Sequence, residues 1–305
     1  MTTTSNTQTN TLTSVRSEKS GGRSEKKVSS KVARSQRVGK TPWLMYCFVV
    51  CILVLFIFPL LYLLNTALKS NSEFITNPVG LVSSFEWGNF AEAWSKGNFG
   101  SYFINTVVYT ICGAGLGTAI SLFMGFPAAR GYIKGTKFWN VLFTLVLFLP
   151  NALMTQFQLL LRLHLYNTQI GYILMVAVGV GIGPLLFTGF VSSIPKDLDE
   201  AAAIDGAGYW TYLFKFIVPL SKPALMTVFI LQAVWIWNEI IMATVLFSDQ
   251  NKFPISAGLF AFKGTYSNNW PLLAAATIIV AAPLVLGYLF IQRYLVNGVL
   301  GAVKG

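Results

Sequence analysis

The sequence carries little charge and few residues suited to chemistry. Of its 305 residues 11% are charged and 54% are hydrophobic, whereas soluble domains carry about 25% charged residues. An ordinary soluble enzyme is therefore excluded. Three cysteines and a single histidine are too few for a disulfide framework or a histidine-rich metal site. A phosphate-binding loop is also lacking, because Gly39-Lys40-Thr41 has Arg34 where that motif needs its first glycine.

Long apolar runs recur along the chain after residue 43. A helical run of about 20 residues crosses the ~30 Å hydrocarbon core of a bilayer. Each run must be a helix, because lipid offers no partner for an unpaired backbone group. Internal prolines predict kinks or broken turns at Pro59, Pro150, Pro184 and Pro283. The prediction is an all-α polytopic membrane protein with six transmembrane helices, at residues 44–65, 103–126, 138–156, 170–190, 224–247 and 271–291.

Lysine and arginine are unevenly distributed between the two sides of the membrane. The segments on the side that includes both termini carry seventeen of them, and the loops on the other side carry five. Because positive segments are retained in the cytoplasm, both termini are expected to be cytoplasmic. Without the residues before the first span the bias is eight against five, which favours the same orientation.

The first 40 residues differ from the rest of the chain. They are rich in Ser, Thr, Lys and Arg and contain no aromatic residue. We expect residues 1–40 to form a disordered basic cytoplasmic tail that is attracted to anionic lipid headgroups. The net charge of +11 comes largely from this tail, and without interleaved aromatic residues it does not predict nucleic-acid binding. We expect residues 41–305 to form the transmembrane domain.

The polar segment at residues 193–208, between the fourth and fifth spans, has its own helix signals. Pro195 suits the first helical position, and the acidic residues Asp197, Asp199 and Glu200 suit the first turns, where negative charge complements the helix dipole. Gly206 is expected to end the helix. A short, rigid helix with small residues on one side is suited to docking on another protein. A capped loop without a partner explains the same pattern equally well.

The residues of this segment resemble a known motif. Glu200-Ala201-Ala202, then Asp205-Gly206-Ala207, followed by Pro219 and Pro223, are similar to the EAA loop of the permease subunits of bacterial ABC importers. Residues 44–305 resemble more closely the carbohydrate-uptake permeases typified by the maltose permease MalG. The resemblance implies the type I ABC importer (MetI-like) permease fold in the bacterial plasma membrane. The permease core would be at about residues 101–293 and the coupling loop at about 193–222.

The resemblance also implies a function. Such permeases catalyse no bond chemistry and hold no cofactor, since separate ATPase subunits bind ATP and magnesium. This chain would import a sugar, expected to be an oligosaccharide, by alternating access. Its partners would be a second homologous permease, two ATPase subunits and an extracellular solute-binding protein. The residues assigned to the ATPase interface are Glu200, Ala201, Ala202, Asp205 and Gly206.

A translocation path is suggested by the fifth span. Glu239 is the only acidic residue inside a span, and an ionisable group in the membrane is a functional hypothesis by default. One helical stripe of this span combines hydrogen-bonding and aromatic side chains of the kind that bind a sugar, at Gln232, Trp235, Glu239 and Met242. Alternatively, Glu239 caps a neighbouring helix or pairs with the partner permease.

A second functional hypothesis is a self-sufficient secondary transporter or channel with Glu239 as its ion-coupling site. Such proteins usually carry inverted repeats and several charges within the membrane. One acidic residue and no visible repeat argue against this class. A membrane enzyme is disfavoured as well, because no nucleophile, base and metal ligands converge in the sequence.

Overall fold

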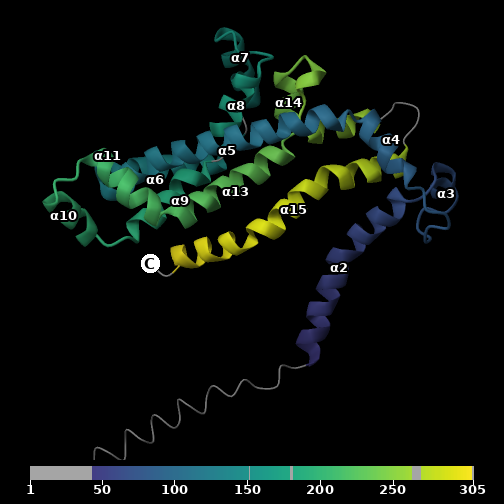
Figure 1. Ribbon diagram of the computed structural model, residues 1–305, viewed down its shortest axis with the longest axis horizontal. Coiled ribbons are helices and arrows are strands. Elements are labelled where there is room, and N and C mark those ends of the chain that lie inside the picture. Colours follow the sequence, from purple (N-terminus) through teal and green to yellow (C-terminus); the bar gives the residue numbers. More distant parts are fainter. Residues whose placement is uncertain (1–42, 151, 179–180, 263–268, 304–305) are drawn as a thin grey trace, which may run out of the picture. The chain divides into compact units, whose positions relative to one another are not determined.

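The computed structural model describes residues 43–150, 152–178, 181–262 and 269–303, which form helices and their connections (Figure 1). The predicted tail at residues 1–40 lies outside the described residues. The chain divides into two compact units, residues 1–60 and 61–305. The described part of the first unit is the start of helix α2 (Trp43–Ala67), which is apolar on all sides and exposed at residues 45–60. A helix that is apolar all round is typical of a membrane span.

The second unit is a helical bundle. In chain order its further elements are α3 (Asn71–Thr76), α4 (Gly88–Lys96), α5 (Phe99–Arg130), α6 (Thr136–Phe148), α7 (Leu153–Arg162), α8 (Gln169–Val178), α9 (Ile182–Ser192), α10 (Asp197–Ile204), α11 (Tyr209–Tyr212), η1 (Leu213–Ile217), α12 (Val218–Leu220), α13 (Lys222–Asn238), α14 (Ile241–Leu246), η2 (Gln250–Lys252), η3 (Ile255–Phe262) and α15 (Trp270–Val303).

Six membrane crossings fit the described residues when each bent pair of helices counts as one span. Three single helices are long and apolar enough: α2, α5 and α15. Three further candidates are bent pairs, namely α6 with α7, α8 with α9, and the segment Tyr209–Leu220 with α13. The last pair is bent by 75°. The number of predicted spans therefore agrees with the structure, but three of the structural candidates are bent pairs. The last of them runs from Tyr209 to Asn238, so it begins and ends earlier in the chain than the predicted span at 224–247.

Three predicted spans need correction, because each is interrupted. The run at 138–156 breaks between α6 and α7, where Pro150 has no N–H to continue the helix. The run at 170–190 breaks between α8 and α9, and Pro184 lies in the first turn of α9. The run at 224–247 breaks at Glu239, between α13 and α14. Hydropathy predicts that a segment is in the membrane, but it does not predict its interruptions.

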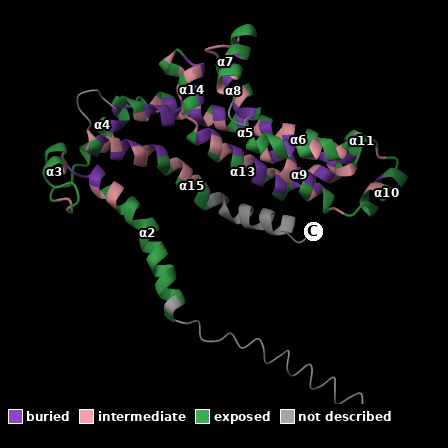
Figure 2. Cartoon of the chain, turned by 180° about the vertical axis from the view of Figure 1, so that it is seen from behind, coloured by how far each residue is buried: buried purple, intermediate pink, exposed green. Residues whose placement is uncertain are grey.

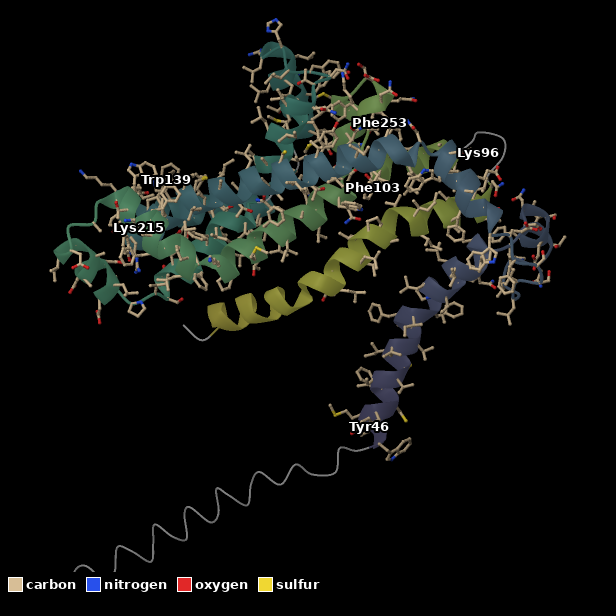
Figure 3. All side chains as sticks on the ribbon, in the orientation of Figure 1. Tyr46, Lys96, Phe103, Trp139, Lys215 and Phe253 are labelled. Atoms are coloured by element: carbon tan, nitrogen blue, oxygen red, sulfur yellow. The ribbon has the colours of Figure 1, made fainter. Side chains whose placement is uncertain are left out.

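Helix α5 is the centre of the bundle. It packs against α8, α9 and α13, and Figure 2 shows buried residues along α5, α9 and α13. One end of the bundle carries α10 and α11, and the other carries α4 (Figure 1). We name these the α10 end and the α4 end. Figure 3 places Lys215 at the α10 end and Lys96 at the α4 end.

The α4 end is organised by a buried lysine. The Lys69 ammonium donates to the carbonyl oxygens of Asn77 (2.8 Å) and Gly80 (2.5 Å). The Asn89 side chain in turn donates to the carbonyl of Lys69 (2.9 Å). A buried charge must be satisfied by hydrogen bonds, so these contacts fix the segment after α2 against α4.

Close packing of α5 requires a small residue at Gly117. A Cβ atom there would lie 2.5 Å from the carbonyl oxygen of Ala177 in α8 and would collide with the Gln232 side chain of α13. Small residues at helix crossings are the usual way for membrane helices to approach closely. Gly115, on the same helix, has open space around its Cα.

We predict that Gly117→Ala lowers the thermal stability of the protein in detergent. Overpacking of this kind costs about 1–3 kcal/mol. The matched control, Gly115→Ala, should leave the midpoint of heat-induced aggregation unchanged. Fluorescence-detected size-exclusion chromatography after heating measures both, and an equal loss in the two variants would contradict this packing argument.

Candidate functional site

Helix α10 has the start and stop that the sequence predicts, with one shift. Its first turn contains Asp197, Asp199 and Glu200, but the helix begins after Lys196, so Pro195 precedes it and does not occupy the first position. At its end Gly206 has a φ of +74°. The N–H of Gly206 donates to the Ala203 carbonyl (3.0 Å), and the next N–H donates to the Ala202 carbonyl (2.9 Å). This is the Schellman motif, which satisfies the last carbonyls of the helix.

One face of α10 is buried in the bundle. Ala202 is 3% exposed and belongs to a hydrophobic cluster with Tyr212, Leu213 and Phe126. The expectation that Ala202 contacts another subunit therefore needs correction. Its small side chain lets α10 lie closely against its own chain, and in this structure it is not accessible to a partner.

The opposite face of α10 is open to solvent. Four residues assigned to an interface are exposed, namely Glu200, Ala201, Asp205 and Gly206. Beside them Ile204 is 87% exposed, and this residue was not among those predicted for the interface. The sequence contained a signal for this exposure. Ile204 is four residues after Glu200 and so shares its helix face, while both are two positions from Ala202 and so lie on the opposite side of the helix. We name these five residues the coupling face.

A buried ion pair fixes α10 to the end of α5. Arg130 Nη2 lies 3.1 Å from Asp199 Oδ1, and the Arg130 side chain is 2% exposed. Arg130 Nη1 also donates to the Ile194 carbonyl (3.0 Å), ahead of α10. The Tyr212 hydroxyl donates to the same Asp199 oxygen. No local sequence pattern relates Arg130 to Asp199, so this anchor could not be predicted from the sequence.

Tyr212, whose hydroxyl donates to Asp199, belongs to a group of tyrosines at the α10 end. A cavity of about 300 Å³ lies beside it, lined by Tyr132, Tyr209 and Ala203 among others. The tyrosine rings and α10 thus form one connected surface at the α10 end.

The residues predicted to form a translocation stripe do not lie on one helix. Helix α13 ends at Asn238, and the Glu239 carboxylate accepts a hydrogen bond from the Met242 N–H (2.7 Å) at the start of α14. The Glu239 carbonyl accepts from the Ser256 hydroxyl (2.9 Å). The prediction that these four residues form one stripe on a single helix is therefore wrong. Of its members Gln232 and Met242 are buried, while Trp235 and Glu239 are partly buried.

Gln232 nevertheless lies at an unusual position. It lines a cavity of about 140 Å³ with Gly117 and Ser121. Its side-chain oxygen is buried without a hydrogen-bond partner among the described residues. An unsatisfied buried acceptor requires a physical explanation. A donor from water or from a passing solute would supply it.

The described residues contain no group of three or more His, Cys, Asp or Glu side chains that could hold a metal ion. Nothing in that part of the chain therefore places a metal at the coupling face or at Gln232.

Comparison with known proteins gives matches along most of the chain. The profile of the family described as binding-protein-dependent transport system inner membrane component matches residues 117–301. The probable ABC transporter permease protein YurM of Bacillus subtilis (strain 168) is 32% identical over 282 residues, which cover 91% of this chain and 93% of that protein. The melibiose/raffinose/stachyose import permease protein MelC of the same organism is 31% identical over 252 residues, 81% of this chain and 91% of that protein.

Two further matches extend this finding. The arabinooligosaccharides transport system permease protein AraQ of Halalkalibacterium halodurans is 30% identical over 270 residues, 86% of this chain and 96% of that protein. A chain in the crystal structure of a bacterial ABC transporter involved in the import of the acidic polysaccharide alginate has a TM-score of 0.73. The match covers 85% of this chain and 98% of the chain in that structure, at 19% sequence identity. At that identity the likeness shows the fold alone, and it confirms the all-α fold expected from the sequence.

We predict that Gly206→Ala loosens the end of α10. An alanine at positive φ costs about 1–2 kcal/mol, and since no atom lies within 4 Å of the new Cβ the cost is conformational. Gly208→Ala is the matched control, because Gly208 has an extended backbone at φ −70° and equally open surroundings. Hydrogen–deuterium exchange of the α10 amides should increase in the first variant alone. Equal exchange in both variants would contradict the role of Gly206.

Proposed function

This chain belongs to the family of binding-protein-dependent transport system inner membrane components, and on that premise we propose that it is the permease subunit of an ATP-driven oligosaccharide importer. Its fold is the all-α, MetI-like permease fold. The single observation that carries the proposed mechanism is the geometry of α10. The helix is fixed to the bundle through Asp199 and Ala202, while Glu200 and Ile204 face outward.

The sugar class follows from the relatives. Two of them, at 30–31% identity, are named for import of melibiose, raffinose and stachyose and of arabino-oligosaccharides. Short, hydroxyl-rich oligosaccharides are therefore the substrates we propose for this chain. The transported sugar undergoes no bond cleavage in this subunit.

The mechanism we propose is alternating access, driven through the coupling face. Two ATPase subunits, which bind ATP and magnesium, would bind to this face. Closure of the ATPase dimer would then displace α10. The buried pair of Asp199 and Arg130 would pass that displacement to α5, and the cluster around Ala202 would pass it to α9 and α13. A second homologous permease and an extracellular solute-binding protein complete the complex. Ligand-driven shifts between two packed arrangements are the usual form of such motion.

The orientation we propose places the α10 end and both termini in the cytoplasm of a bacterial cell. It rests on the excess of lysine and arginine in the segments of that side. The basic residues of the tail would then lie next to anionic lipid headgroups. The α4 end faces the other side of the membrane.

We propose that Gln232 is the polar contact for the sugar in the translocation path. Trp235 and Met242, which lie near it in sequence, are assigned to the same path. The unpartnered side-chain oxygen of Gln232 beside a cavity supports this choice. For Glu239 we propose a different role as a cap of α14, which the hydrogen bond from the Met242 N–H to its carboxylate supports. The same cap weakens the alternative of a self-sufficient transporter with Glu239 as its ion-coupling site.

The direct test is reconstitution of the chain with the products of its neighbouring genes. Proteoliposomes that contain the full complex should accumulate raffinose or an arabino-oligosaccharide only with ATP and the binding protein. The chain alone should not. Accumulation by the isolated chain would support the secondary transporter and would overturn this proposal.

We predict that Ile204→Asp reduces recovery of the ATPase subunits with the affinity-tagged permease. Burial of an isoleucine side chain is worth about 1.5–3 kcal/mol, so the expected loss of affinity is at least about tenfold. Ile75→Asp is the matched control, since Ile75 is 70% exposed at the α4 end. Quantitative pull-down from detergent extracts measures both variants. Undiminished recovery with Ile204→Asp would remove Ile204 from the interface.

A further inference from the structure

A cavity of about 340 Å³ lies at the α4 end of the bundle. It is formed between the turn from α4 to α5 and the segment from η2 to η3, in the region of Lys96 and Phe253 in Figure 3. This volume is at the lower end of the range of about 300–1,000 Å³ that is typical of small-molecule sites. We name it the amide cup, after the three amide side chains that line it, Asn98, Gln250 and Asn251.

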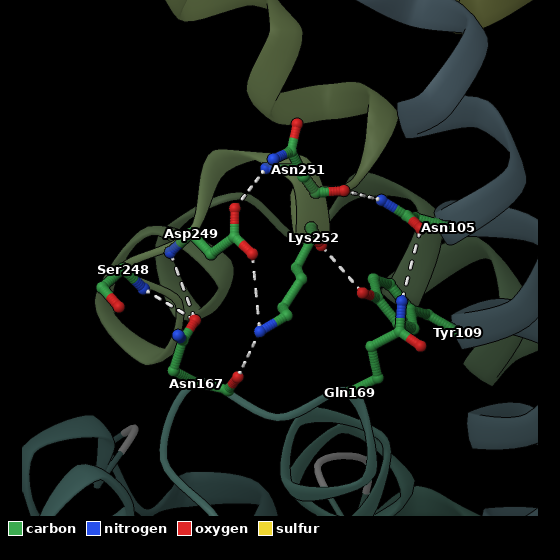
Figure 4. A network of polar contacts seen from close by, with 8 residues as sticks. All are labelled: Asn105, Tyr109, Asn167, Gln169, Ser248, Asp249, Asn251 and Lys252. Atoms are coloured by element: carbon green, nitrogen blue, oxygen red, sulfur yellow. Dashed lines mark hydrogen bonds and ion pairs between the residues drawn. The ribbon is translucent and has the colours of Figure 1, made fainter.

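The backbone of the cup is held in place, whereas its amide side chains are not engaged. Asn105 donates to the carbonyls of Asn251 (2.7 Å) and Phe253 (3.1 Å), and Tyr109 donates to the carbonyl between them (2.8 Å), as Figure 4 shows in part. No hydrogen bond to another described residue involves the side chains of Asn98, Gln250 or Asn251. A free amide offers both donors and an acceptor. The cup can therefore bind hydroxyl groups in either direction.

Aromatic rings complete the lining. Tyr102 and Phe253 lie with ring centroids 6.3 Å apart, and Phe260 is 47% exposed at the cup. Gly258, which also lines the cup, has no room for a side chain, because a Cβ atom would lie 2.5 Å from the Phe99 ring and 2.8 Å from the Gly97 carbonyl oxygen. Apolar ring faces next to free amides match the two surfaces of a sugar ring, its C–H face and its hydroxyl edge.

The charge balance of the cup favours a neutral ligand. Lys96 is the one charged residue lining it within the described chain, and its ammonium lies 2.5 Å from Glu92. In the adjoining network Lys252 pairs with Asp249 (3.5 Å), as Figure 4 shows. With these charges paired, no free cation remains among the described lining residues to select a phosphate or an acidic sugar.

We propose that the amide cup is a weak binding site for one ring of a neutral saccharide, where the transported sugar first contacts this subunit. The inference rests on the proposed importer function and on the orientation that places the α4 end outside the cytoplasm. Weak binding is suited to transport, because the solute must leave the site as well as enter it.

The test uses the complete complex, with whichever of raffinose or an arabino-oligosaccharide the wild type imports. Saturation-transfer NMR on complexes in lipid nanodiscs, without the binding protein, reports direct contact, and uptake by proteoliposomes reports KM. The variants are Phe260→Ala and the double variant Gln250→Ala with Asn251→Ala. Phe260→Tyr keeps the ring, and Phe85→Ala removes an exposed phenylalanine outside the cup.

Both cup variants should weaken saturation transfer to the sugar and raise KM about tenfold, while complex recovery and the Phe85→Ala control stay at the wild-type level. Phe260→Tyr, which keeps the ring, should lose less saturation transfer than Phe260→Ala. Variants that match the wild type in both measurements would overturn the cup and leave the importer function intact. Altered uptake with unchanged saturation transfer would assign the surface to the binding protein and would also overturn the cup. A wild-type complex that imports neither sugar with ATP would contradict the proposed function itself.

Discussion

The ion pair between Arg130 and Asp199 connects the exposed helix α10 to the centre of the bundle. Buried ion pairs add little net stability, but removal of one partner leaves the other charge buried and costs about 3–5 kcal/mol. The two partners differ in burial, since the Arg130 side chain is 2% exposed and that of Asp199 is 23% exposed. Arg130 therefore depends on Asp199 more than the reverse. Because α5 packs against α8, α9 and α13, this contact joins α10 to the helix at the centre of the bundle.

The number of membrane segments could be predicted from the sequence because bilayer thickness sets a minimum length for an apolar run. Their interruptions could be predicted only in part. Pro150 correctly indicated a break, whereas the break at Glu239 lies in a run with no proline or glycine between Ala224 and Phe247. It depends on contacts that sequence periodicity does not contain, such as the hydrogen bond from Ser256 to the Glu239 carbonyl. The carboxylate that suggested an ionisable site in a continuous helix is a helix cap.

The coupling segment shows the same division between local and long-range information. Both ends of α10 follow from neighbouring residues. Gly206 could be assigned to the Schellman end from the sequence, and the start of the helix could be predicted to within one or two residues. The direction in which α10 faces depends on what lies beneath it. Ala202 is covered by Tyr212 and Leu213, and Ile204 is consequently exposed. The amide cup likewise combines Asn98 with Gln250, which are far apart in the chain.

The central claim is that the pair of Arg130 and Asp199 transmits motion from the ATPase subunits to α5. The most direct measurement is the number of sugar molecules imported per ATP hydrolysed by the reconstituted complex. Asp199→Asn should still hydrolyse ATP but import less sugar per ATP, because the ion pair that joins α10 to Arg130 of α5 is lost. Asp197→Asn, an exposed neighbour in the same turn of α10, should keep the wild-type ratio. An unchanged ratio in Asp199→Asn would contradict the account.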